Sequence, residues 1–246
     1  FHNVNGISLL NKMKLFRVAK IICNSNFTKN VIDKEYGVSS VVLYPPVGTD
    51  LYRPKRKTDQ ICYVSRFSNL TQNKGHEILI KQFKKLVKEK KFINWKLVLA
   101  GGVEVGADNY LKGLKKLAEG SNIEFVESPT LEALQNIFGK SKIFWSGAGF
   151  NEDEVKNPEK VEHFGITLVE SMSAGCVPIV YGAGGYKEII DDGKNGYLWQ
   201  NGKDLIDITK KIVRESGTLK RLSVEAIKSS KKYGYEEFKK QIKEII

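Results

Sequence analysis

The chain is poor in the residues that build disulfide frameworks and metal centres, with three cysteines and three histidines among its 246 residues. The cysteines are Cys23, Cys62 and Cys176. They form an odd, scattered set, and two of them lie inside apolar runs, which favours reduced thiols in a cytoplasmic protein over a disulfide framework. His2, His76 and His163 share no metal-ligand spacing. The sequence therefore predicts no metal site and no bound cofactor.

Long apolar runs are also absent, because no stretch approaches the ~20 residues that a helix needs to cross a bilayer. The chain begins with Phe1, and nothing near it resembles a signal peptide. We therefore expect that a preceding segment is missing. With 41% hydrophobic and 28% charged residues the composition is that of an ordinary soluble globular protein. Its length suits one large domain or one and a half smaller ones.

Acidic residues are outnumbered by basic ones, 28 against 40, and the formal net charge is +12. Many lysines lie on one predicted helix, on the face opposite its apolar residues, which favours a solvated helix face. These lysines are Lys81, Lys84, Lys85, Lys88, Lys90 and Lys91. The alternative is an anionic partner, either nucleic acid or the acidic inner face of a membrane. No zinc-finger, RRM or KH signature occurs, so we predict no nucleic-acid partner and leave peripheral membrane contact open.

The amino-terminal segment differs from the rest of the chain. It contains a basic amphipathic stretch at Ser8–Arg17, an apolar run at Val18–Cys23 and a helix from about Asn24 to Tyr36. A second short strand follows at Val41–Tyr44. The proline-rich residues 45–54 cannot continue that strand, so they indicate a linker.

From about Asp59 onwards, apolar strands alternate with helical segments. Such alternation, with nearly continuous apolar strands, predicts an α/β fold with a parallel sheet covered by helices on both faces. The predicted strands are Ile61–Val64, Trp95–Ala100, Ile123–Val126, Ile143–Trp145, Val177–Tyr181 and Gly196–Trp199. The predicted helices are 76–91, 107–119, 130–139, 166–174, 184–191, 203–216, 218–232 and 235–246.

Residues suited to an anionic ligand follow several of these strands. Arg66 follows the first strand, and Lys74 precedes the next helix. Gly101-Gly102 and Gly184-Gly185 follow two further strands. Because ligands of parallel sheets bind beyond the carboxyl ends of the strands, we expect these basic residues, glycines and helix starts to meet at one edge.

The stretch 161–175 is the centre of this pattern. Glu162 and Glu170 bracket a turn that leads into a helix beginning near Gly165. The first amides of such a helix are unpaired, and together with the helix dipole they favour a phosphate. The two glutamates are then placed to reach hydroxyl groups on either side of that phosphate. A nucleotide sugar fits this description, although the same spacing of glutamates recurs elsewhere in the chain without such surroundings.

Two other classes of nucleotide-binding protein lack support. A dehydrogenase should show Gly-x-Gly-x-x-Gly after its first strand, where this chain has Ser65-Arg66-Phe67. A P-loop nucleotidase should show Gly-x4-Gly-Lys-Ser/Thr, which the sequence does not contain.

The ordered motifs resemble a known family over roughly residues 20–246. They are Val64–Phe67 with Lys74-Gly75, Leu97–Gly102, Glu162–Val180, Gly184–Glu188 and Asp192–Trp199. Together they are similar to the retaining family 4 glycosyltransferases (group 1), with their Glu-x7-Glu motif. That family has the GT-B fold of two facing Rossmann-like domains. The resemblance implies that this chain is mostly the carboxy-terminal, donor-binding Rossmann-like domain.

The resemblance also implies roles for individual residues. Arg66 and Lys74 would contact the donor diphosphate, Glu162 would bind hydroxyls of the donor sugar, and Glu170 would hold the ribose. The distal phosphate would be cradled by the backbone of Phe164, Gly165, Ile166, Thr167 and Leu168. The nucleobase would lie near the loop Glu127, Ser128 and Pro129. Gly184 and Gly185 are either part of the donor site or only a tight turn.

The implied reaction transfers a hexose from a UDP- or GDP-linked sugar to a glycan or lipid-linked acceptor, with retention of anomeric configuration. Fixed cations at Arg66 and Lys74 would make a metal redundant, and the Asp-x-Asp metal motif of the other large glycosyltransferase fold does not occur. A non-catalytic sugar-nucleotide-binding module and a GT-B epimerase stay open as alternatives. The reduced thiols predict a location in the cytoplasm, and the basic surface leaves the inner membrane face open as a peripheral site.

The resemblance divides the chain into four parts. Residues 1–44 would be a remnant of the amino-terminal acceptor domain, 45–58 a linker, and 59–232 the donor-binding domain. Residues 233–246 would form a helix that crosses back to the amino-terminal part. Two features depart from the family pattern, namely His163 where many relatives carry proline and the insert Gly147–Lys160 before Glu162.

Overall fold

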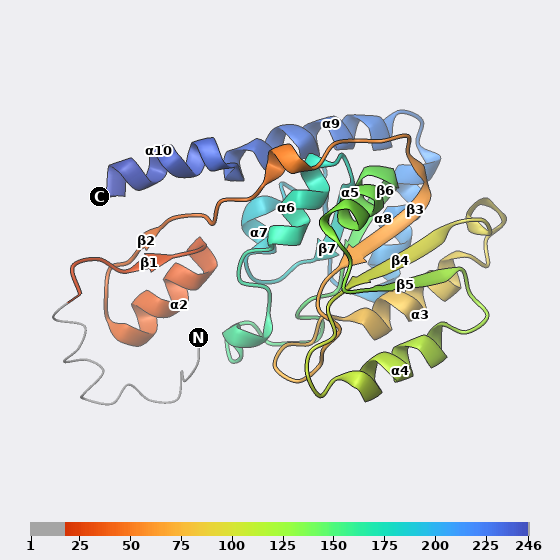
Figure 1. Cartoon of the computed structure of the whole chain (residues 1–246), viewed down its shortest axis with the longest axis horizontal. Coiled ribbons are helices and arrows are strands. Elements are labelled where there is room, and N and C mark those ends of the chain that lie inside the picture. The colour runs from red at the N-terminus through yellow and green to blue at the C-terminus, as the bar shows by residue number, and fades with distance from the viewer. Residues whose placement is uncertain (1–17, 246) are drawn as a thin grey trace.

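The computed structural model describes residues 18–245, in which two parallel sheets of unequal size form the framework (Figure 1). The large sheet has six strands in the order β5-β4-β3-β6-β7-β8, and the small sheet pairs β1 with β2. The strands are β1 (Ile22–Cys23), β2 (Val41–Val42), β3 (Thr58–Val64), β4 (Lys96–Gly101), β5 (Ile123–Glu127), β6 (Ser141–Ser146), β7 (Val177–Tyr181) and β8 (Tyr197–Trp199). The stretch Ser8–Arg17 lies outside the described residues.

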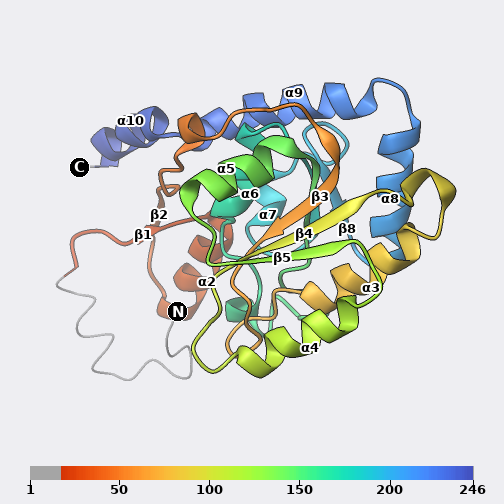
Figure 2. The ribbon, with the colours of Figure 1, turned by 45° about the vertical axis from the view of Figure 1, so that its right-hand side comes forward.

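Helices cover both faces of the large sheet (Figure 2). On one face α3 contacts α4 and α8, and on the other α6 contacts α5 and α9. The main helices are α2 (Asn26–Tyr36), α3 (His76–Leu86), α4 (Asp108–Ala118), α5 (Leu131–Lys140), α6 (Ile166–Ser173), α7 (Tyr186–Ile189), α8 (Gly202–Arg214), α9 (Thr218–Ser230) and α10 (Tyr235–Ile245). The predicted α/β fold with a doubly covered parallel sheet is confirmed.

The central strands are apolar because both of their faces are buried. Ile61 in β3 pairs with Leu97 of β4 and with Ile143 of β6, and all three side chains are fully buried. Removing this much apolar surface from water is the main force that stabilises such a sheet. It also explains why these strands read as continuous apolar runs in the sequence.

The strand order fixes where the sheet offers a crevice. The chain runs from β3 outwards to β5, then returns to β6 beside β3 and runs outwards to β8. Ligands of doubly wound sheets bind at such a switch point, beyond the carboxyl ends of the strands. Here the segments after β3 and β6 meet closely, since a Cβ on Gly75 would lie 2.2 Å from the carbonyl oxygen of Gly147.

Two predicted helices differ most from the structure, in which both are much shorter. The helix predicted at 76–91 ends at Leu86, and a separate 3-10 turn at Lys90–Phe92 buries Phe92 against Trp95. The helix predicted at 184–191 is reduced to α7. It starts after Gly184, which has a positive φ of 58°, and ends where Ile190 becomes extended.

Residues 18–44, here called the amino-terminal unit, consist of β1, α2 and β2 and lie beside the large sheet (Figure 1). The backbone amide of Val47 donates to the carbonyl oxygen of Tyr233 at 2.8 Å, which ties the segment after β2 to the start of α10. At the far end of α10, the Lys20 ammonium donates to the carbonyl oxygen of Ile245. The division of the chain into an acceptor-domain remnant, a linker and a donor domain stays a prediction.

We expect Ile143→Ala to lower the free energy of unfolding by about 2–5 kcal/mol, because it leaves a cavity in the middle of the sheet. Ile93→Ala is the matched control, since Ile93 is 64% exposed whereas Ile143 is 0% exposed. Urea unfolding followed by circular dichroism measures both. Equal losses for the two variants would contradict the placement of Ile143 in the core.

Candidate functional site

Lys74 and Glu162 meet at the switch point of the sheet. The Lys74 ammonium lies 3.1 Å from Oε2 of Glu162, and the two side chains are 10% and 23% exposed. Gln72 accepts a hydrogen bond from Lys74 through its Oε1 and donates through its Nε2 to the carbonyl oxygen of Val161. A nearly buried ammonium needs such partners. The segment after β3 and the turn before α6 are thus joined by an ion pair and by Gln72, which the sequence reasoning did not single out.

The backbone around Lys74 is held from several sides. The side chain of Asn73 accepts a hydrogen bond from the Gly75 amide at 2.8 Å, and the Tyr63 hydroxyl donates to the carbonyl oxygen of Lys74 at 2.9 Å. Gly75 has a positive φ of 70° and packs against Gly147, where any side chain would clash. Lys74 is therefore presented from a rigid turn.

His76 is a buried hydrogen-bonding centre behind this turn. Its Nε2 lies 3.0 Å from Oγ of Ser65, and its Nδ1 lies 3.3 Å from the hydroxyl of Tyr110. Burial, with the nearby Lys74 charge as a second cause, lowers the pKa of His76 from 6.5 to about 3. A neutral imidazole donates through one nitrogen and accepts through the other, so His76 holds Ser65, the residue before Arg66.

Arg66 is exposed and pairs with Glu104, not with Glu162. Its side chain is 60% exposed, and its Nη1 lies 3.8 Å from Oε1 of Glu104. The turn that carries it is fixed, because a Cβ on Gly101 would come within 1.9 Å of the Ser65 carbonyl oxygen. The exposed guanidinium offers a fork of donors to an anionic group in the crevice.

The start of α6 offers backbone amides. The first helical hydrogen bond runs from the Val169 amide to the carbonyl oxygen of Gly165 at 3.2 Å, and no side chain caps the helix. The amides of Ile166, Thr167 and Leu168 precede that bond, and no acidic residue lies in the first turn. This is the arrangement that favours an anion. Gly165 has φ 112°, and a Cβ there would lie 2.6 Å from the Tyr186 ring.

Phe164, by contrast, directs its side chain into the core. Its ring centroid lies 5.7 Å from that of Tyr44 and 5.4 Å from that of Tyr233. Aromatic rings at these separations attract one another beyond the effect of simple burial. Phe164 therefore anchors the turn that precedes α6 to residues from both ends of the chain.

Gly184 and Gly185 lie directly behind Glu162 and His163. A Cβ on Gly184 would lie 2.1 Å from the Glu162 carbonyl oxygen, and one on Gly185 would lie 2.2 Å from that of His163. The Gly185 amide donates to the Glu162 carbonyl oxygen at 2.8 Å. These glycines permit the close approach that fixes the Glu162 backbone.

Glu170 points towards Tyr52. The Tyr52 hydroxyl donates to Oε1 of Glu170 at 3.1 Å, and Tyr52 is nearly buried. Burial raises the pKa of Glu170, and the hydrogen bond from Tyr52 partly offsets that rise. Sequence reasoning missed Tyr52 because it lies in the proline-rich stretch, where no periodic pattern marks a buried side chain.

The loop after β5 lies at the outer end of the same edge. The Ser128 amide donates to the Gly101 carbonyl oxygen at 2.8 Å, and Ser128 has a positive φ of 49°. Glu127 pairs with Lys115 at 2.5 Å, and Pro129 follows at the start of the turn into α5. β5 and β6 are three strand spacings apart, about 14 Å. The loops after β5 and β6 therefore begin at well-separated points of the same sheet edge.

The insert Gly147–Lys160 is tied to the site at two points. The Gly149 amide donates to the Asn73 carbonyl oxygen at 3.0 Å. Oε2 of Glu154 accepts from the Gly184 amide at 2.8 Å, and Oε1 of Glu154 pairs with Lys187. The insert therefore spans from the Lys74 turn to the loop after β7, with Glu162 between them. No sequence pattern pointed to Glu154.

His163 faces the amino-terminal unit. Its ring stacks on that of Phe27, with centroids 6.5 Å apart and an interplanar angle of 21°. Burial lowers the pKa of His163, and the neighbouring Glu162 charge opposes that shift. Within residues 18–245, no three His, Cys, Asp or Glu side chains are grouped closely enough to hold a metal ion.

Comparison with known proteins identifies one family. The family model for glycosyl transferases group 1 matches residues 52–229. A mouse GDP-Man:Man(3)GlcNAc(2)-PP-Dol alpha-1,2-mannosyltransferase is 28% identical over 186 residues, which cover 68% of this chain and 35% of that protein. An uncharacterised glycosyltransferase of Methanocaldococcus jannaschii is 25% identical over 245 residues, covering 96% of this chain and 63% of that protein.

Solved structures show the same fold. The Anabaena HepE protein in complex with UDP and glucose superposes with a TM-score of 0.77 at 18% identity, covering 97% of this chain and 67% of that one. The chain spans 35% and 63% of the lengths of the mouse and archaeal relatives.

The low pKa of His76 predicts a pH-dependent stability. On acidification the unfolded chain takes up a proton near pH 6.5, whereas folded His76 stays neutral until about pH 3. The stabilisation of the folded chain by neutral His76 is fully present above pH 6.5 and is lost as the pH falls. The free energy of unfolding therefore decreases by about 2 kcal/mol between pH 7 and pH 5. We expect urea unfolding to show that loss in the wild type. Between pH 7 and pH 5, His76→Gln should lose about 2 kcal/mol less free energy of unfolding than the wild type.

Tyr110→Phe is the matched control, because it removes a hydrogen bond to His76 and keeps the buried imidazole. It should retain the acid loss of the wild type. Equal losses between pH 7 and pH 5 in the wild type and His76→Gln would show that His76 is not buried in its neutral form.

Proposed function

Because the chain belongs to the group 1 glycosyltransferases, we propose that it binds a nucleotide diphosphate sugar along the carboxyl edge of its sheet and transfers the hexose. The acceptor in this proposal is a glycan or a lipid-linked sugar. One observation carries it, namely that Lys74 and Glu162 meet beside the uncapped amino terminus of α6. A cation, amides free for an anion and a carboxylate for hydroxyls thus lie together.

In this proposal the protein stabilises the charge of the departing nucleoside diphosphate. Leaving-group departure makes the phosphate more negative while the sugar gains oxocarbenium character. Lys74, Arg66 and the α6 amides are fixed donors, and fixed donors lower a barrier when they interact more strongly with the transition state than with the ground state. The same cations support metal-independent transfer.

In this proposal, the Lys74–Glu162 ion pair is replaced when the donor binds. A donor phosphate replaces Glu162 as the partner of Lys74, and Glu162 turns to the sugar hydroxyls. Glu170 holds the ribose, with Tyr52 fixing its carboxylate from behind. The two glutamates therefore act as a clamp on the donor and not as an acid–base pair.

We propose retention of anomeric configuration, membership of family 4 and a functional Glu-x7-Glu motif at Glu162 and Glu170. Support comes from where these glutamates lie. Glu162 precedes the turn that leads into α6, and Glu170 lies within that helix. A non-catalytic binding module and an epimerase of the same fold remain the alternatives, and turnover experiments distinguish all three.

Similar proteins support two donor bases. The HepE structure contains UDP and glucose, and the name of the mouse relative specifies GDP-mannose and a lipid diphosphate acceptor. We accordingly propose a UDP- or GDP-linked hexose as donor and a saccharide or lipid-linked saccharide as acceptor. The Glu127–Pro129 loop is the segment that we assign to the base.

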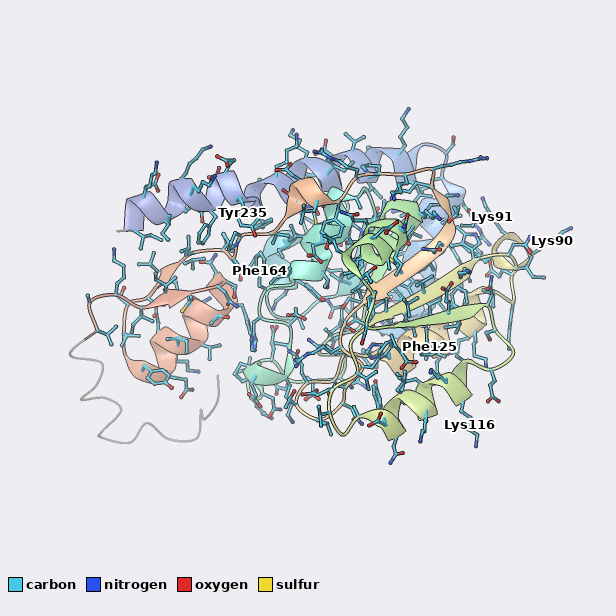
Figure 3. All side chains as sticks on the ribbon, in the orientation of Figure 1. Lys90, Lys91, Lys116, Phe125, Phe164 and Tyr235 are labelled. Atoms are coloured by element: carbon cyan, nitrogen blue, oxygen red, sulfur yellow. The ribbon has the colours of Figure 1, made fainter. Side chains whose placement is uncertain are left out.

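We propose a cytoplasmic location, which the buried free thiols support. Within the described residues, no helix has the length and apolar character needed to cross a membrane. Lys90, Lys91 and Lys116 lie at the amino-terminal end of the sheet, away from Phe164 (Figure 3). Because membrane contact through these lysines would turn the crevice away from the lipid, we propose that a lipid-linked acceptor approaches the carboxyl edge of the sheet and that any membrane contact lies on that side.

Donor binding by this chain tests the proposal directly. We expect calorimetry to detect UDP or GDP, and Lys74→Ala to weaken the better ligand about 10- to 100-fold through loss of a charge-assisted hydrogen bond. Lys85→Ala removes an exposed lysine of α3 as a control and should bind like the wild type. Absence of nucleotide binding, or equal affinities of both variants, would overturn the assignment.

Turnover in the intact enzyme tests the chemistry. NMR of the product should show the anomeric configuration of the donor, and Glu162→Gln should slow transfer by roughly 100-fold or more, as for loss of a transition-state contact. An inverted product would refute retention. Donor conversion without an acceptor hydroxyl would favour an epimerase, and tight binding with no turnover would favour a binding module.

A further inference from the structure

The carboxylate of Glu188, on α7, lies at the amino terminus of α2. Oε1 of Glu188 accepts a hydrogen bond from the Phe27 amide at 2.7 Å, and Oε2 accepts one from the Asn26 amide at 2.9 Å. Oε2 also accepts from Nδ2 of Asn26 at 3.0 Å and from the Tyr44 hydroxyl at 3.1 Å. All four donors belong to the amino-terminal unit.

This contact completes the cap of α2 from outside its own segment. The first amides of a helix have no partner within the helix, and the helix dipole favours negative charge there. Oγ of Ser25 accepts from the Thr28 amide at 3.0 Å, which leaves the amides of Asn26 and Phe27 for Glu188. A carboxylate that accepts several amide hydrogen bonds makes strong, charge-assisted contacts.

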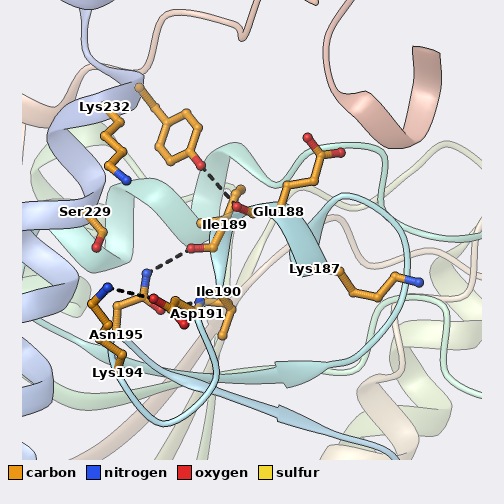
Figure 4. Close-up of a pocket in the computed structure, with 10 residues that line it drawn as sticks. Lys187, Glu188, Ile189, Ile190, Asp191, Lys194, Asn195, Ser229 and Lys232 are labelled. Carbon is orange, nitrogen blue, oxygen red and sulfur yellow. Dashed lines mark hydrogen bonds and ion pairs between the residues drawn. The ribbon is translucent and has the colours of Figure 1, made fainter. Parts of the chain in front are cut away.

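The side chain of Glu188 is committed to this contact and not to the hollow beside it. Residues around Glu188 line a pocket of ≈ 380 Å³ with Lys194 and Lys232 (Figure 4). Figure 4 shows the Glu188 carboxylate turned away from that pocket. Burial, followed by the Glu188 charge, raises the pKa of Tyr44 to about 12, so Tyr44 stays a hydrogen-bond donor at neutral pH.

The capped helix end lies next to the part of the crevice that we assign to the donor sugar. Phe27, whose amide Glu188 holds, stacks on the His163 ring. His163 follows Glu162, and the glycines that fix the backbone of both residues immediately precede α7. The same short segment thus holds Glu162 from behind and the amino-terminal unit from the side.

We propose that Glu188 is a positioning residue that holds the amino end of α2 over the sugar end of the donor site. When this contact is lost, Phe27 moves away from His163 and the sugar loses one wall of its pocket, whereas the diphosphate keeps Lys74, Arg66 and the α6 amides. Glu188 therefore acts on the affinity for the nucleotide sugar and not on that for the nucleoside diphosphate. This inference rests on the proposed function.

The test compares two ligands in each variant of the chain. Calorimetry is performed with UDP against UDP-glucose and with GDP against GDP-mannose, and the pair that the wild type binds is carried forward. We expect Glu188→Ala to weaken the nucleotide sugar about tenfold or more while the nucleoside diphosphate changes less than about twofold. Glu236→Ala, which removes an exposed glutamate of α10, is the control and should change neither.

Hydrogen exchange in the absence of ligand tests the contact independently of any donor. Exchange at the amides of Asn26 and Phe27 should accelerate in Glu188→Ala and stay unchanged in Glu236→Ala. Glu188→Gln keeps one acceptor oxygen and should give intermediate exchange and an intermediate affinity for the nucleotide sugar. It also serves as the working variant if the alanine variant does not fold.

The outcomes separate the two proposals. Unchanged exchange, or equal weakening of both ligands, overturns the role of Glu188 while the proposed function stands. Faster exchange with unaltered affinities would mean that Glu188 holds α2 in place without a role in donor binding. This outcome also overturns the proposed positioning role. A wild type that binds no nucleotide refutes the proposed function, and the positioning role with it, even where exchange confirms the contact between Glu188 and α2.

Discussion

Backbone segments approach one another so closely at the carboxyl edge of the sheet that side chains are excluded at particular positions. Gly75 faces Gly147, Gly101 faces Ser65, and Gly184 faces Glu162, each at a distance where a Cβ would overlap a carbonyl oxygen. Because carbonyl groups cannot move aside as flexible side chains do, these contacts fix how the loops sit relative to the strands. The orientation of Lys74, Arg66 and Glu162 depends on them.

Most charged groups around the crevice already have a protein partner. Lys74 pairs with Glu162, Arg66 with Glu104 and Lys187 with Glu154, while Glu188 caps a helix. Because partial burial makes an unpaired charge costly, these contacts stabilise the charged side chains at this edge of the sheet. In the proposed function, a ligand anion exchanges partners with Glu162 or Glu104. A ligand that carries both phosphate and hydroxyl groups then satisfies the cations as well as the carboxylates that it separates.

The sequence predicted the strands, the sheet type and the helix start at Gly165, because burial on two faces and helix initiation leave local patterns. Because both residues follow parallel strands, the sequence also predicted that Glu162 and Lys74 lie at one edge of the sheet. Their direct contact agrees with that prediction. Tyr52, Gln72, Glu154 and the contact of Glu188 with α2 were not predicted. Each of these residues makes a hydrogen bond that only the folded chain brings about. No periodic pattern in the sequence marks a single tyrosine in a proline-rich stretch or a glutamate in an insert.

The strand spacing of the sheet separates the tasks of the crevice. The loops that carry Ser128, Arg66 and Glu162 arise from different strands, and β5 and β6 are three spacings apart. The loop after β5 is held by the bond from the Ser128 amide to the Gly101 carbonyl oxygen, whereas the Glu162 backbone is held by the Gly185 amide. In the proposed function, the base lies against the first of these loops and the sugar against the second. The proposal therefore implies that specificity for the base and specificity for the sugar change through substitutions in different loops.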